Sequence, residues 1–262
     1  MVKKTIKLKK SRKHKKKQTK FLRKEKIKDV EFSRFLNKGT NASSNIVNYH
    51  YQSQSNILNF LYKLYKEKKI NDVSFFSIPD DAILEIDILN KKVHPLYLKS
   101  LIFLKKLKLC LKNKFTPLSV RSLLPIHKKD IESHANVIII DSELKNIEIF
   151  EPHGYKQKYS DTYESVSKYH NKIYLLKKYF KKILPKYRFI NVVNYIKSIS
   201  FQSKYDARSG YCVTWSTLYA HYRMINPKIK ISELMKYLNK KINKNLLLRY
   251  SRFIEDKLKN KI

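Results

Sequence analysis

Cysteine and acidic residues are both scarce in this sequence, and each shortage excludes some classes of protein. The two cysteines, Cys110 and Cys212, are far apart and form no CxxC motif. This argues against a disulfide framework and against a cysteine-rich zinc site.

No apolar run approaches the roughly 18 residues that a transmembrane helix needs. The basic start of the chain is not followed by the apolar stretch of a signal peptide. We therefore expect reduced thiols, as in an intracellular setting or a virion assembled there, and no membrane partner.

The shortage of acidic residues leaves a large positive charge. The chain has 21 Asp and Glu against 58 Lys and Arg, which gives a formal net charge of +37. Such a charge favours anionic partners, either nucleic acid or acidic protein surfaces. The abundance of Lys, Asn, Ile and Tyr also fits AT-rich codon use, so genome bias and selection for nucleic-acid binding both remain open as explanations.

Composition divides the chain into three segments. Residues 1–36 are expected to form a basic, disordered arm, because the cations crowded into residues 1–28 repel one another. Residues 37–46 are small, polar and turn-prone, which is typical of a linker. Residues 47–262 form the predicted domain. Residues 1–28 either bind nucleic acid or carry a nuclear address, or they are a solvated tail.

Apolar spacing separates helical from extended segments in the domain. Helices are predicted around 57–65, 96–111, 161–184, 212–225 and 231–260, the last region as one or two helices. Strands are predicted at 122–126, 135–140, 147–150 and 187–195, and a turn at 141–146 joins the middle two into a β-hairpin. We therefore predict an α+β fold, with a central, mostly antiparallel sheet flanked by helices.

Cys212 occupies the position of a reactive thiol. It follows Gly210-Tyr211 and opens the helix predicted at 212–225, which has no Pro or Gly before the stop at Pro227. Backbone amides and the helix dipole stabilise a thiolate at a helix N-terminus. Gly210 allows the backbone to approach a substrate carbonyl. Cys110 lies between two leucines and is predicted to be an inert core thiol.

The predicted hairpin brings a base and a carboxylate together. With the turn centred near residues 143 and 144, residue 134 faces residue 153 and residue 136 faces residue 151. Glu151 is then a diagonal neighbour of His134 on the same face of the sheet. His153 is a competing base under the same register. A zinc site formed by His134, His153 and Cys212 is disfavoured, because the paired short ligand spacings are missing.

The order of these motifs resembles the papain-unrelated cysteine proteases of the adenovirus-protease and SUMO-protease superfamily. The similarity covers residues 118–230 and is closest to thiol proteases assigned to large DNA viruses. Leu123-Leu-Pro-Ile126 resembles the apolar strand that precedes the family's histidine. Three further segments carry it: Ser133-His-Ala-Asn-Val-Ile-Ile-Ile-Asp141, Ile147-Glu-Ile-Phe-Glu-Pro-His-Gly154 and Gly210-Tyr-Cys-Val-Thr-Trp-Ser216, the last followed by Arg223-Met-Ile-Asn-Pro227.

The resemblance assigns roles by position. His134 falls on the general base, Glu151 on the orienting acid, Cys212 on the nucleophile and Gln202 on the oxyanion-hole glutamine. Two departures matter: the family acid is commonly Asp, and the segment between Gln202 and Cys212 is longer than in SUMO proteases.

The resemblance also implies an activity and a setting. It implies hydrolysis of peptide or isopeptide bonds in protein substrates. We expect no metal and no cofactor, although the sequence leaves an activating cofactor open. A viral setting follows, in virion protein maturation or removal of ubiquitin-like modifiers, in the host cytoplasm or virion, or in the nucleus.

Two other functions stay open. Bacterial effector acetyltransferases are similar to this family and use His, Glu and Cys in the same order, so the glutamate at position 151 fits them too. The second alternative is a non-enzymatic, nucleic-acid-binding virion protein on the same scaffold, which the charge favours and the intact set of catalytic residue types opposes.

Overall fold

The computed structural model of the protein describes residues 27–30, 51–67, 83–125, 131–153, 163–195, 201 and 211–259. The linker predicted at 37–46 and most of the arm predicted at 1–36 lie outside these residues. Among the described helices, none is both long and apolar enough to cross a lipid bilayer.

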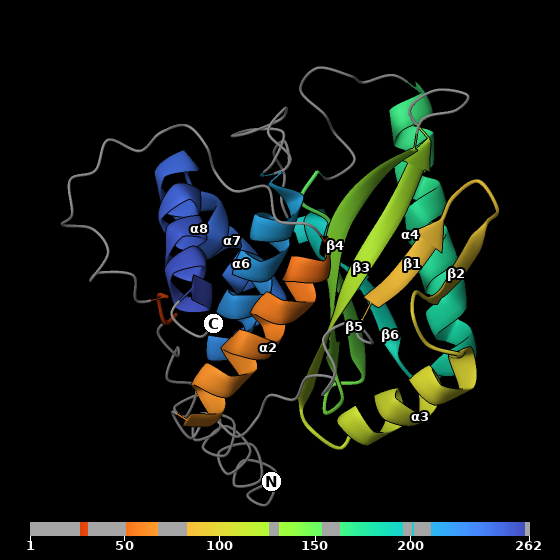
Figure 1. The fold of residues 1–262 in the computed structure, drawn as a ribbon, viewed down its shortest axis with the longest axis horizontal. Helices are drawn as coiled ribbons and strands as arrows, with labels where there is room; N and C mark the ends of the chain where they lie inside the picture. The colour runs from red at the N-terminus through yellow and green to blue at the C-terminus, as the bar shows by residue number, and fades with distance from the viewer. Residues whose placement is uncertain are drawn as a thin grey trace, which may run out of the picture.

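A six-stranded sheet forms the centre of the domain (Figure 1). Its strands are β1 (Ile83–Asp87), β2 (Lys92–Pro95), β3 (Phe115–Pro125), β4 (Ile131–Asp141), β5 (Asn146–Phe150) and β6 (Arg188–Asn191). They lie in the order β2-β1-β3-β4-β5-β6. The pairs β1–β3 and β5–β6 are parallel, and the other three pairs are antiparallel. The prediction of a mostly antiparallel sheet in an α+β fold is therefore confirmed.

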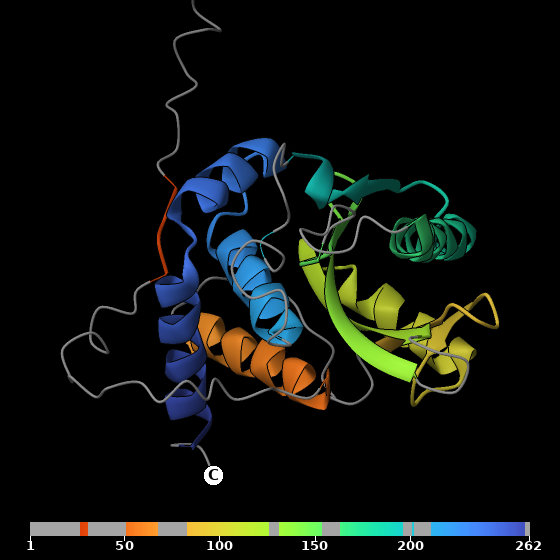
Figure 2. The ribbon, with the colours of Figure 1, turned by 90° about the horizontal axis from the view of Figure 1, so that it is seen from above.

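Helices cover both faces of this sheet, as the view from above shows (Figure 2). The helices are α2 (Tyr51–Glu67), α3 (Ser100–Cys110), α4 (Tyr163–Ile183), α6 (Cys212–Ile225), α7 (Ile231–Lys241) and α8 (Lys244–Lys259). On one side, α2, α6, α7 and α8 contribute to a single core with β4. On the other side, α3 and α4 pack against β1, β3, β4 and β5.

The alternation of side chains along β4 explains why its apolar run is continuous. Val137 and Ile139 point into the core that contains α6, whereas Ile138 and Ile140 point into the core that contains α4. A strand covered on both faces needs apolar residues at successive positions. Each of these side chains is fully buried and contributes about 1.5–3 kcal/mol through burial.

A buried ion pair ties α6 to the sheet. Glu148 of β5 and Arg223 near the end of α6 are both buried, and Arg223 Nε donates to Glu148 Oε2 at 2.9 Å. Tyr219, one turn earlier in α6, donates its hydroxyl to the same oxygen at 3.0 Å. These bonds fix α6 relative to β5 and therefore also position its first residue, Cys212.

Several local predictions need correction. The strands β1 and β2 were not predicted. The helix predicted at 96–111 begins only at Ser100, and its buried residues Phe103 and Leu107 are four apart. The sequence repeats leucine every third residue there, at Leu98, Leu101, Leu104 and Leu107. Such a repeat drifts around a helix of 3.6 residues per turn, so Leu101 is 67% exposed. The strand predicted at 187–195 is shorter, because residues Val192–Tyr195 form a 3₁₀ helix, η3.

The four described residues of the predicted arm pack against the helices. Val30 belongs to the core that contains α6. The backbone N–H of Lys28 donates to Asn226 Oδ1 at 2.7 Å, and Asn226 Nδ2 donates back to the Lys28 carbonyl at 3.0 Å. Residues 27–30 therefore contribute to the packed domain.

Candidate active site

The β4–β5 hairpin has the predicted register. Val137 pairs with Phe150 and Asp141 pairs with Asn146, so position 136 lies opposite position 151. Asp141 lies at the turn end of the hairpin, where its Oδ1 accepts hydrogen bonds from the backbone N–H groups of Glu143 and Leu144. The open end of the hairpin therefore holds His134 and Glu151, a strand length away from Asp141.

His134 and Glu151 form a close, buried pair. The distance between His134 Nε2 and Glu151 Oε1 is 2.6 Å. Their exposed fractions are only 4% and 1%. Because Nε2 faces the carboxylate, the other ring nitrogen of His134, Nδ1, is the one left to exchange a proton with a nucleophile.

Glu151 accepts further bonds that hold its carboxylate in place. Its Oε1 also accepts the backbone N–H of His153 at 3.0 Å, and its Oε2 accepts Asn136 Nδ2 at 2.7 Å. The buried Asn136 is itself held by Ser122, whose Oγ donates to Asn136 Oδ1 at 2.9 Å. Asn136 was not predicted as a site residue, although the predicted register already set it opposite Glu151.

Cys212 is the first residue of α6, so the helix predicted at 212–225 is confirmed. The backbone N–H of Ala135 donates to Cys212 Sγ at 3.4 Å. This N–H is available because β5 ends at Phe150, opposite Val137, and β4 continues beyond the last pair. The thiol therefore lies against the residue that adjoins His134.

The first turn of α6 also places backbone amides and the positive end of the helix dipole beside the thiol. Tyr211 is the N-cap residue, and no side chain caps the helix there. The first turn contains no acidic residue. The amides at a helix N-terminus and the positive end of the helix dipole favour negative charge at this position.

The two cysteines do not differ in their degree of burial. Cys110, predicted to be a core thiol, is half-buried at the end of α3, and Cys212 is half-buried as well. Their surroundings differ: Cys110 packs against the apolar core on the α4 side of the sheet, whereas Cys212 lies beside the His134 segment.

Lys172 of α4 is a site residue that sequence reasoning missed. Its Nζ contacts Glu151 Oε2, and its side chain is 3% exposed. Burial lowers the pKa of Lys172 from 10.5 to about 7, and the nearby Cys212 opposes that shift. Burial also lowers the pKa of His134 well below 6.5, and the charge of Lys172 lowers it further.

His153, the competing base, lies next to His134. The two ring centroids are 4.5 Å apart, and the rings are tilted by 47°. Burial lowers the pKa of His153 well below 6.5, with a further contribution from His134. Both imidazoles are therefore neutral near pH 7. His134 is the one whose ring is hydrogen-bonded to Glu151.

Gln202, together with Gly210 and His127, lies outside the described residues. Phe201, which immediately precedes Gln202, is buried and stacks on Trp215 of α6, with ring centroids 5.6 Å apart. Within the described part of the chain, no group of three or more His, Cys, Asp or Glu side chains is arranged to hold a metal ion.

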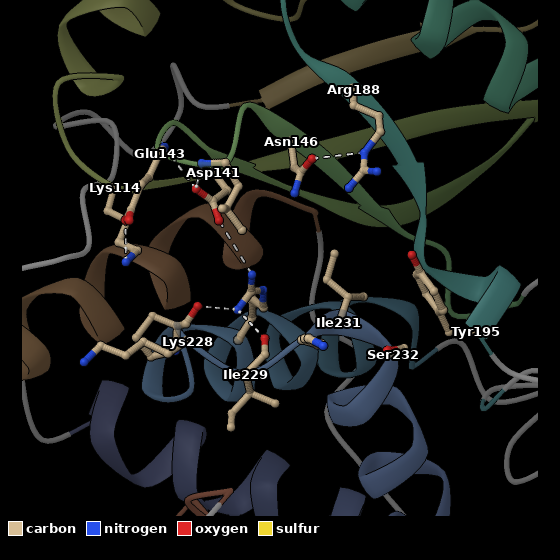
Figure 3. Close-up of a pocket in the computed structure, with 14 residues that line it drawn as sticks. Lys114, Asp141, Glu143, Asn146, Arg188, Tyr195, Lys228, Ile229, Ile231 and Ser232 are labelled. Carbon is tan, nitrogen blue, oxygen red and sulfur yellow. Dashed lines mark hydrogen bonds and ion pairs between the residues drawn. The ribbon is translucent and has the colours of Figure 1, made fainter. Parts of the chain in front are cut away.

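A separate cavity of about 440 Å³ lies at the turn end of the hairpin (Figure 3). It contains none of the four predicted site residues. Cationic side chains outnumber acidic ones in its lining, which includes Lys114, Arg188, Arg223, Lys228 and Lys230. Such an excess is expected for any surface hollow of a chain with a net charge of +37, and Arg223 is already neutralised by Glu148.

Comparisons with known proteins give distant structural likenesses. No protein-family model and no curated protein matches the chain. The Chlamydia trachomatis effector protein ChlaDUB1 is similar at 13% identity, with a TM-score of 0.44 over 81% of this chain and 85% of that one. The Legionella pneumophila effector protein RavZ, in a structure with human LC3B, is similar at 12% identity, with a TM-score of 0.40 over 89% of this chain and 68% of that one. Both TM-scores are below 0.5, so the proposed function depends on the arrangement of His134, Glu151 and Cys212 in this chain.

Proposed function

We propose that this protein is a cysteine peptidase in which Cys212 is the nucleophile, His134 the general base and Glu151 the residue that orients the base. One observation carries this proposal: a buried His134–Glu151 pair at 2.6 Å adjoins the backbone N–H that is 3.4 Å from Cys212 Sγ. A nucleophile, a base and an orienting acid at these spacings are the parts that covalent acyl transfer requires.

In the first half of the reaction, the Cys212 thiol transfers its proton to His134 Nδ1, and the sulfur attacks the carbonyl carbon of the substrate. The tetrahedral intermediate collapses when His134 gives that proton to the leaving amine and the C–N bond breaks. A thioester on Cys212 remains. A water molecule then loses a proton to His134, attacks the thioester and releases the acid, which restores the thiol.

The protonation state of His134 suits this role. Because burial and Lys172 keep its pKa well below 6.5, the ring is neutral at pH 7 and can accept a proton. The Glu151 carboxylate then stabilises the imidazolium that forms during the reaction.

We also propose that the oxyanion is stabilised by backbone amides at the start of α6 and by Gln202. The position of Cys212 as the first residue of α6, in a first turn without acidic residues, supports the backbone part. Gln202 enters this proposal through the resemblance in sequence; the residue before it, Phe201, stacks on Trp215, one turn beyond Cys212. Each such donor is worth about 2.7–4 kcal/mol in the transition state.

The proposed substrate is a protein chain, cut at a peptide or isopeptide bond. The resemblance to viral proteases motivates a role in virion protein maturation or in removal of ubiquitin-like modifiers. The net charge of +37 supports retention of the enzyme near nucleic acid or acidic protein surfaces.

The test is a comparison of new peptide N-termini after incubation of a proteome-derived peptide library with wild-type protein, Cys212→Ser and Cys110→Ser. We expect cleavages in the wild type and in Cys110→Ser, and none in Cys212→Ser. A parallel incubation with acetyl-CoA separates the acetyltransferase alternative. Cys212-dependent lysine acetylation without cleavage would replace the peptidase proposal, and an absence of any Cys212-dependent product would leave the non-enzymatic alternative.

A further inference from the structure

Lys172 is the one buried residue among the lysines whose side-chain exposure the structure describes, and the proposed mechanism does not require a lysine. A buried ammonium is costly unless a counter-charge lies against it. Lys172 meets this condition, because its Nζ contacts Glu151 Oε2.

The position of Lys172 in α4 is that of a core residue. Leu176 and Phe180 follow it at four-residue intervals, and both are buried against the sheet. An apolar residue at position 172 would continue this stripe. The helix instead directs an ammonium to the end of β5, where the Glu151 carboxylate lies.

Several ionisable groups of the proposed site lie around Lys172. Glu151, after β5, contacts it directly. Cys212 of α6 interacts with its charge. Its charge in turn acts on His134 of β4, which also faces His153. The carboxylate therefore has one oxygen on the ammonium and the other on the imidazole.

We infer that Lys172 is a positioning residue of the site formed by Cys212, His134 and Glu151. Its ammonium holds the Glu151 carboxylate in place, with Oε1 turned toward His134 Nε2, and it opposes protonation of His134 in the resting enzyme. This inference deepens the proposed function and rests on it.

This arrangement has a consequence for the acid limb of activity. An imidazole beside a lone carboxylate gains a proton readily, whereas an imidazole beside a carboxylate already balanced by an ammonium does so less readily. Lys172 thus keeps His134 available as a base at lower pH. A lysine that only filled space in the core would leave the titration of His134 unchanged.

The experiment is an NMR titration of the His134 ring in wild type, Lys172→Met, Lys172→Arg and Lys178→Met. Met keeps the length of the lysine stem without the charge, and Arg keeps the charge. Lys178 is exposed on the same helix and serves as the matched control. We expect the His134 midpoint to rise by about one pH unit or more in Lys172→Met, to stay low in Lys172→Arg and to stay unchanged in Lys178→Met.

The acid limb of kcat/KM should move to higher pH in Lys172→Met to the same extent as the His134 midpoint. An unchanged His134 midpoint in Lys172→Met would overturn the inference. If Lys172→Met does not fold, the wild-type titration alone decides, because a His134 midpoint at or above 6.5 would contradict it. The ring titration requires no substrate, so a protein without peptidase activity but with the predicted shifts would refute the proposed function and not the role of Lys172 toward His134.

Discussion

Replacement of Glu151 by Gln is the most informative single change in the site. The carboxylate accepts from four donors: His134 Nε2, the His153 backbone N–H, Asn136 Nδ2 and Lys172 Nζ. An amide has one accepting oxygen and one donating nitrogen. Whichever way it is turned, its NH₂ group faces donors, so the site loses either the bond to His134 or the bonds to Asn136 and Lys172.

We expect this substitution to lower kcat by about 10⁴-fold, as for other triads in which an amide replaces the acid. The stability cost depends on pH. Loss of one partner from a buried ion pair costs about 3–5 kcal/mol when the other charge remains buried. Lys172, whose pKa is already about 7, can release its proton instead, so the loss of stability should be smaller at pH 8 than at pH 6.

Two assays test this reasoning: hydrolysis of a peptide identified in the library experiment, and thermal unfolding at pH 6 and pH 8. Glu143→Gln is the matched control, since Glu143 lies in the turn of the same hairpin with its side chain 63% exposed. The control should keep wild-type activity and a Tm close to that of the wild type. A Glu151→Gln variant within tenfold of wild-type kcat would refute the role given to the carboxylate.

Three further predictions concern stability and binding. Arg223→Met leaves the buried Glu148 without its counter-charge and should lower the free energy of unfolding by about 3–5 kcal/mol, as measured by urea unfolding. A loss below about 1 kcal/mol would contradict the structural role of the ion pair. The Lys172 pKa, near 7 when folded and 10.5 when unfolded, means that the unfolded chain binds more protons between these values. The stability of wild type relative to Lys172→Met should therefore rise from pH 7 to 10.5, and a flat difference would argue against a buried lysine. Removal of residues 1–26, which spares the Lys28 bonds to Asn226, should flatten the salt dependence of DNA binding; an unchanged slope would mean that the arm is not the binding element.

Local patterns in the sequence were sufficient to predict the β4–β5 hairpin and α6, the helix that begins at Cys212. The continuous apolar run that ends at Ile140, followed by a polar turn, defined β4 and its register with β5. The stretch without Pro or Gly before Pro227 defined α6 to its first residue. In both cases the signal lies within about fifteen residues, so periodicity and turn chemistry carry it.

Other parts of the site depend on packing between distant segments. The Ala135–Cys212 contact joins residues 77 apart in the sequence, and the Glu148–Arg223 pair joins residues 75 apart. Periodicity does not determine how a helix sits on a sheet. Lys172 carried a usable signal, because a charged residue at a four-residue interval before Leu176 breaks an apolar stripe. In a helix with many lysines, that signal was easily overlooked.

The strands β1 and β2 were missed for a different reason. The turn between them contains no Gly or Pro, and Lys91 adopts a positive φ of 54° there. Left-handed conformations are uncommon for a side chain of this kind. The sequence therefore lacks the Gly or Pro that most often marks a hairpin turn, although Leu84 and Ile86 are buried in the core on the α4 side.

Competitive alkylation of the two cysteines tests whether Cys212 is a nucleophile activated by His134. Cys212 and Cys110 are both half-buried, so accessibility alone predicts similar rates of reaction with iodoacetamide. Quantification of both modified peptides by mass spectrometry, in wild type and in His134→Ala, gives each rate with Cys110 as the internal reference. We predict that Cys212 reacts at least about tenfold faster than Cys110, as expected for an activated thiol, and that His134→Ala removes most of this advantage. Equal rates at the two cysteines, or a Cys212 rate that His134→Ala does not change, would contradict the account.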